Sequence, residues 1–143
     1  MSMLTVGETL ARLRAAGCTV APLGDRLAVD RPDPATPEAV RAVADLRADL
    51  DTVRAVLADV WRYLGARCCR GPRVWCEADR AHEDYRAHGG RLDRATFTAA
   101  VEADGRAVLT PGGILAGVGL LRKWGQEDGG TRAARTRKGG AAR

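Results

Sequence analysis

The feature that most constrains this chain is a regular run of apolar residues between positions 37 and 64. Thr36, Pro37 and Glu38 open the run with a capping hydroxyl, a proline at the first helical position and an acid near the positive end of the helix dipole. The apolar positions then recur every three or four residues, which predicts a long amphipathic helix or coiled coil. A break near residues 45–49 would divide it into two consecutive helices, and the spacing allows both arrangements. The stripe consists of Val40, Val43, Leu46, Leu50, Val53, Leu57, Val60 and Leu64.

A stripe of this size predicts a contact surface. It offers more apolar area than a short hairpin covers, so we expect the 37–64 helix to mediate self-association or contact with a partner. Leu50 lies in the middle of the stripe. We therefore expect Leu50→Asp to be severely destabilising, because it would place an unpaired carboxylate in a buried seam.

The residues before this run predict a helix followed by a β-hairpin. Thr5 and Glu8 have the spacing of a capping box, and Gly17 is a helix stop signal. Two short β-compatible runs then flank Gly24 and Asp25, which suits a type II′ turn. Pro22 lies in the first of these runs, so it must occupy an edge or an unpaired position.

The second half predicts a small helical segment. Gly71 and Pro72 indicate a linker over 66–73, and apolar spacing favours a helix over 74–88. We expect Asp93 to cap a short helix, 106–109 to form a brief strand, and a last helix to begin at Thr110 and Pro111 and to reach Trp124. The expected fold class is α+β and mostly helical. It comprises an αββα(α) domain over 1–65, the linker 66–73, a helical domain over 74–125 and a tail over 126–143, which is basic and too poor in apolar residues to fold.

The order of elements in residues 4–60 resembles the TubC-type N-terminal docking domain, an αββαα module of hybrid polyketide and nonribosomal peptide assembly lines. The resemblance rests on a helix ending in Arg-x-x-Gly at Gly17, a Gly-Asp-Arg-Leu hairpin over 24–27, and Thr-Pro-Glu at 36–38 opening a helix with a leucine-rich end. In such modules the hairpin edge and the neighbouring helix receive a short peptide of a partner protein. The resemblance implies partner contacts at Val20, Arg26, Leu27 and Val29, and a non-catalytic docking or adaptor function.

An alternative function is nucleic-acid binding in a replication or mobile-element system. The second half resembles, more distantly, the helical segments of phage and plasmid replication proteins, at Trp75, Cys76, residues 85–90 and Phe97. The net charge of +5 favours acidic partners. A basic tail would bind phosphates with a steep dependence on salt. Its candidate contacts are Arg132, Arg135, Arg137 and Lys138.

The sequence contains no recognisable catalytic constellation. It lacks a G-x-S-x-G motif, a P-loop and a strand followed by G-x-G-x-x-G, so we expect neither enzymatic activity nor a cofactor. The candidates for a metal site are Cys68, Cys69, Cys76 and His82, with His88 beyond them. Adjacent Cys68 and Cys69 cannot chelate as a C-x-x-C pair does, so buried or idle thiols are the favoured interpretation.

The expected compartment is the cytoplasm. The first residues contain no basic region leading into an apolar one, so they do not resemble a signal peptide. The longest uncharged stretch, 107–121, is shorter than the roughly 20 residues that a membrane span needs. We therefore expect no membrane contact.

Overall fold

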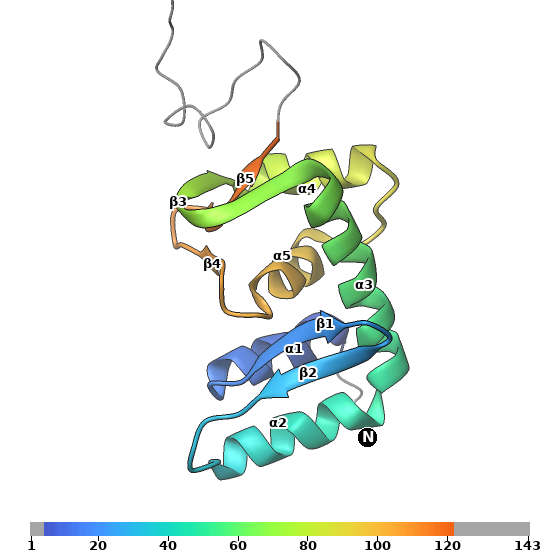
Figure 1. Ribbon diagram of the computed structural model, residues 1–143, viewed down its shortest axis with the longest axis vertical. Coiled ribbons are helices and arrows are strands. Elements are labelled where there is room, and N and C mark those ends of the chain that lie inside the picture. The colour runs from blue at the N-terminus through green and yellow to red at the C-terminus, as the bar shows by residue number, and fades with distance from the viewer. Residues whose placement is uncertain (1–4, 122–143) are drawn as a thin grey trace, which may run out of the picture.

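The computed structural model describes residues 5–121, and their fold is mostly helical α+β, as the sequence predicts. In Figure 1 the hairpin and the first two helices lie at one end and the second sheet at the other, with α3 running between them. The sheets are antiparallel, with strand orders β1–β2 and β3–β5–β4. In chain order the elements are α1 (Val6–Ala15), β1 (Thr19–Leu23), β2 (Arg26–Asp30), α2 (Pro37–Ala48), α3 (Leu50–Arg67), β3 (Cys68–Glu77), α4 (Ala78–Ala87), α5 (Arg94–Glu102), β4 (Val108–Leu109) and β5 (Ile114–Leu120).

The first helix and the hairpin confirm the local signals of the sequence. At the start of α1 the hydroxyl of Thr5 accepts from the amide of Glu8 at 3.1 Å, and the Glu8 carboxylate accepts from the amide of Thr5 at 2.8 Å. Gly24 has a φ of 63°, and no non-glycine residue in the described range has a positive φ. This is the conformation that a type II′ turn requires of its first central residue. Pro22 lies opposite Leu27 in the hairpin.

The apolar stripe folds as two helices, with the break at Asp49. Helix α2 begins where Thr36 Oγ1 accepts from the amide of Ala39 at 3.1 Å, and α3 begins at Leu50. The core of the protein covers most of the stripe, but Val40 is 53% exposed and Leu50 is 39% exposed. The predicted continuous seam is therefore wrong at these two positions. Leu50 is the first residue after the break, which turns it out of the core.

The second half contains a sheet where the sequence analysis predicted a linker and helices. The expected linker 66–73 is wrong, because β3 spans Cys68–Glu77 and pairs with β5. The expected helix over 110–124 is wrong within the described residues, where Ile114–Leu120 is a strand. Gly113 and Gly117 have φ values of 84° and 103°, which no right-handed helix contains. Helix α4 is shorter than predicted, since residues 74–77 belong to β3.

Two smaller predictions for this half are confirmed. Asp93 caps α5, because its Oδ1 accepts from the amide of Thr96 at 2.9 Å. The brief strand expected within 106–109 is β4, which consists of Val108 and Leu109. Both depend on signals local in sequence, a capping side chain and a short β-compatible run.

The two halves share one core. Leu10 of α1, Leu57 of α3 and Phe97 of α5 are fully buried and belong to the same cluster of buried side chains. Helix α1 packs closely on α5, where a Cβ atom added to Gly7 would lie 3.0 Å from Thr96 Oγ1. Residues on both sides of the expected linker thus contribute to one cluster of buried side chains.

Candidate functional site

The outer edge of β2 is open, whereas the outer edge of β1 is covered. The amide of Val20 in β1 donates to the carbonyl of Ala103 at 2.7 Å, so it points away from β2. In an antiparallel pair of strands, the backbone N–H and C=O groups of two opposed residues either all point toward the neighbouring strand or all point away from it. Val20 is opposite Val29. The N–H and C=O groups of Val29, and of Leu27 two residues earlier, therefore point away from β1. Within residues 5–121 no backbone hydrogen bond satisfies these four groups.

A groove runs beside this open edge, between the hairpin and the helices α2 and α3. It has a volume of about 480 Å³ and is open to solvent. Its lining divides into two chemical classes, apolar side chains and arginines, and contains no acid. The apolar side chains are Leu27, Val29, Val43, Leu46 and Leu50, and the arginines are Arg26, Arg31, Arg47 and Arg54.

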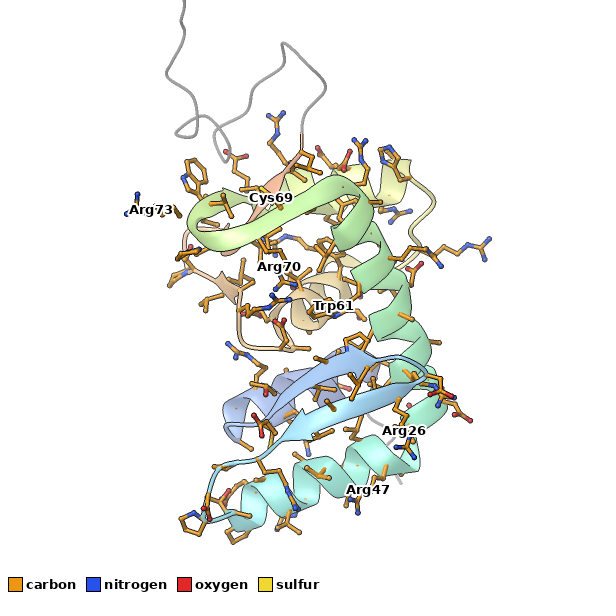
Figure 2. All side chains as sticks on the ribbon, in the orientation of Figure 1. Arg26, Arg47, Trp61, Cys69, Arg70 and Arg73 are labelled. Carbon is orange, nitrogen blue, oxygen red and sulfur yellow. The ribbon has the colours of Figure 1, made fainter. Side chains whose placement is uncertain are left out.

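The charge of this groove is a local property. Residues 5–121 contain sixteen arginines and sixteen acids, so the described part of the chain is formally neutral. Arg26 of β2 and Arg47 of α2 lie at the same end of the molecule in Figure 2. Neither they nor Arg31 form an ion pair within the described range. Three guanidinium groups without an ion pair in residues 5–121, beside the apolar side chains of the groove, favour a ligand that is both acidic and apolar.

Arg54 fixes the hairpin against α3. Its Nη1 donates to the carbonyl of Asp25 in the hairpin turn at 3.0 Å, and its Nη2 donates to Asp51 at 2.9 Å. The side chain thus joins the turn at one end of the groove to the first turn of α3. This contact links the hairpin turn to α3 beside the groove.

The structure brings three of the four predicted partner contacts to the groove. Arg26, Leu27 and Val29 line it, whereas Val20 is 1% exposed and belongs to the core. Sequence reasoning expected the 37–64 run and the helix beside the hairpin to contact a partner, but it named no contact residues on α2 or α3. The recurrence of basic residues beside the apolar stripe, at Arg47 and Arg54, was the signal that could have indicated them.

The predicted metal candidates do not come together. Within residues 5–121 no group of three or more histidine, cysteine or acidic side chains is placed to hold a metal ion. His82 Nε2 lies 2.8 Å from the carbonyl of Leu92. Cys68 and Cys76 are buried, and Cys69 is half-buried. Burial raises the pKa of the Cys68 thiol to about 12, which disfavours the thiolate that metals bind.

The other predicted contacts lie outside the described residues. Arg132, Arg135, Arg137 and Lys138, the candidates for nucleic-acid binding, all follow residue 121. Residues 122–143 contain seven basic and two acidic residues, which account for the whole net charge of +5. None of the helices in residues 5–121 has both the length and the apolar character of a membrane span.

A second polar cluster joins α3 to α4 and has a structural role. The hydroxyl of Tyr63 donates to Asp84 Oδ2 at 2.8 Å, and Arg67 Nη2 donates to Asp84 Oδ1 at 3.1 Å. Burial acts to raise the pKa of Asp84, but the hydrogen bonds from Arg67 and Tyr63 outweigh it and hold that pKa below its usual value. Burial also raises the pKa of Tyr63 well above its ordinary range, so its hydroxyl stays protonated.

Comparisons with known proteins give no indication of function, so the groove is the main evidence for it. No protein-family model, no curated protein sequence and no solved structure matches this chain.

Proposed function

We propose that this protein is a non-catalytic docking protein that binds an extended, acidic peptide of a partner along the open edge of β2. The observation that carries the proposal is the position of the groove, an apolar floor lined with arginines directly beside four unbonded backbone groups. An added strand would pair with the outward N–H and C=O groups of Leu27 and Val29. This is the mode of recognition known as β-strand addition.

The three parts of the groove would contribute in different ways. Backbone pairing supplies hydrogen bonds worth about 0.5–1.5 kcal/mol each, which hold any extended peptide. The floor formed by Leu27, Val29 and Leu46 takes apolar side chains at every second position of the peptide. The arginines select for acidic positions and repel basic ones, which sets specificity and the rate of association.

The same charge disfavours pairing of two copies through β2. An antiparallel pairing of this edge with itself would bring Arg26, Arg31, Arg47 and Arg54 of both chains into one interface. Like charges placed opposite each other on paired strands are destabilising. The groove therefore fits a hetero-partner better than a second copy of this chain.

The proposal is tested with a fluorescein-labelled hexapeptide of alternating glutamate and valine. Its matched control carries lysine in place of each glutamate. Fluorescence anisotropy should show saturable binding of the glutamate peptide and at least tenfold weaker binding of the lysine peptide. Equal binding of the two peptides, or no binding of either, would contradict the proposal.

A pair of variants on one helix locates the effect. Arg47→Glu reverses a charge in the groove, whereas Arg41→Glu makes the same change on the same helix outside it. An exposed ion pair is worth about 0.2–1 kcal/mol, so replacing attraction by repulsion should cost about 0.5–2 kcal/mol, or about 2- to 30-fold in Kd. Arg41→Glu should change Kd less than twofold. A loss of affinity as large in Arg41→Glu would place the peptide elsewhere.

A further inference from the structure

A cluster on the other side of β1 combines an aromatic ring, two guanidinium groups and one carboxylate. We call it the Trp61 cluster and define it as Trp61 of α3, Arg70 of β3, and Asp104 and Arg106 of the loop after α5. The Arg70 guanidinium lies 4.8 Å from the centre of the indole ring and the Arg106 guanidinium 5.6 Å from it. Figure 2 shows Trp61 and Arg70 directed into the space between the hairpin and the second sheet.

One carboxylate serves both arginines. Asp104 Oδ1 accepts from Arg70 Nη2 at 3.2 Å, and Oδ2 accepts from Arg106 Nε at 2.7 Å. The side chain of Asp104 is only 7% exposed, and that of Arg70 is 15% exposed. The cluster therefore holds two positive charges against one negative charge, and Arg70 and Asp104 are largely out of contact with water whereas Arg106 is mostly exposed. Arg14 Nη1 lies near Gly105 in the same loop and adds a third positive charge nearby.

Three nitrogen atoms of the cluster have no acceptor. Nε1 of Trp61 and Nε and Nη1 of Arg70 are buried, and no group in residues 5–121 accepts a hydrogen bond from them. Buried polar groups in folded proteins nearly always have a partner. These three are all donors and lie next to an excess of positive charge, so the missing partner is an acceptor, and an anion fits it better than a neutral group. Burial also lowers the pKa of Arg70, which is the sign of a cation without full compensation.

We infer that the Trp61 cluster is a binding site for a small oxyanion, in which Arg70 and the indole N–H of Trp61 donate to the anion. Asp104 holds Arg70 by a hydrogen bond, and its negative charge is already neutralised by the two arginines. Arg106 is 61% exposed, so it is the member that can move aside to admit the ligand from solvent. Phosphate and carboxylate groups share this chemistry, and the test separates them.

The test is the thermal stability of the full chain in the presence of phosphate, sulfate or acetate, with chloride holding the ionic strength constant. A ligand that binds only the folded state raises Tm in a saturable manner. The site predicts a rise of several degrees with phosphate or sulfate. If acetate raises Tm as well, the site binds oxyanions in general. If only phosphate and sulfate raise Tm, the site is specific for tetrahedral oxyanions. No rise with any of the three would overturn the inference.

Variants separate this site from a general effect of salt. Trp61→Phe keeps an aromatic ring beneath the guanidinium groups but removes the indole N–H, and it should weaken phosphate binding about tenfold. Arg70→Met should abolish it. Arg73→Gln removes an exposed arginine of the same strand outside the cluster, and it should bind phosphate as the wild type does.

The variants also give a second way to reject the site. The same rise in Tm for Arg70→Met as for the wild type would overturn the inference. If Arg70→Met does not fold, Trp61→Phe decides instead, because it removes a single donor and keeps the aromatic ring. Unchanged phosphate affinity in Trp61→Phe would then overturn the inference.

Discussion

Leu50 provides the sharpest test of how the stripe of residues 37–64 is used. Because Leu50 is 39% exposed, Leu50→Asp removes only part of the burial energy of a leucine, about 1–2 kcal/mol. The new carboxylate would lie at the first position of α3, where its interaction with the helix dipole stabilises the fold by about 0.3–1 kcal/mol. The net loss is about 1 kcal/mol, which corresponds to a fall in Tm of about 4 °C.

The matched change at Leu57 should behave differently. Leu57 is fully buried, so Leu57→Asp places a carboxylate in the core and should cost more than about 4 kcal/mol. Thermal unfolding followed by circular dichroism at 222 nm measures both variants. The reasoning is refuted if Leu50→Asp loses as much stability as Leu57→Asp. In the peptide titration, Leu50→Asp should lose at least tenfold in affinity, because its carboxylate takes the place of the peptide's acids among the arginines.

Two further predictions concern the second half of the chain. Gly117→Ala should lower the free energy of unfolding by at least about 3 kcal/mol, because Gly117 has a φ of 103° and an added Cβ would meet the Arg106 carbonyl oxygen. Chemical denaturation measures this change, and a midpoint equal to that of the wild type would contradict the strand geometry. Asp84→Asn should be less stable than the wild type at pH 7, and the difference should shrink as the pH falls below the usual carboxyl pKa of 3.8, because a lowered pKa stabilises the fold only while the group is ionised. A difference that is constant from pH 7 to pH 3 would show that the charged contacts of Asp84 with Arg67 and Tyr63 are not what stabilises it.

The sequence predicts the elements whose signals are local. Thr5 with Glu8, Gly24 in the turn, and Thr36 before Pro37 each act over a few residues, and the structure confirms all three. Each works because a cap or a turn is decided by the backbone conformation of one residue and its nearest neighbours.

The second sheet could not be predicted in this way. Strand β3 is stabilised by β5, about 45 residues later in the chain, and no pattern within 66–77 reveals that partner. The apolar spacing of Ile114, Leu115 and Val118 fits a helix, but the backbone conformation of Gly117 excludes one. For the same reason the contact residues were named only on the hairpin, although the 37–64 run was expected to contact a partner, since the positions of Arg47 and Leu50 depend on the break at Asp49.

The most direct test of the docking account is amide hydrogen exchange on β2, measured by NMR with and without the glutamate–valine peptide. Without peptide, the amides of Leu27 and Val29 should exchange rapidly and that of Ala28 slowly, because only Ala28 faces β1. With saturating peptide, the account predicts that exchange at Leu27 and Val29 slows at least tenfold while Ala28 changes little. If the peptide binds and Leu27 and Val29 still exchange as rapidly as before, no strand has been added to β2 and the account is wrong.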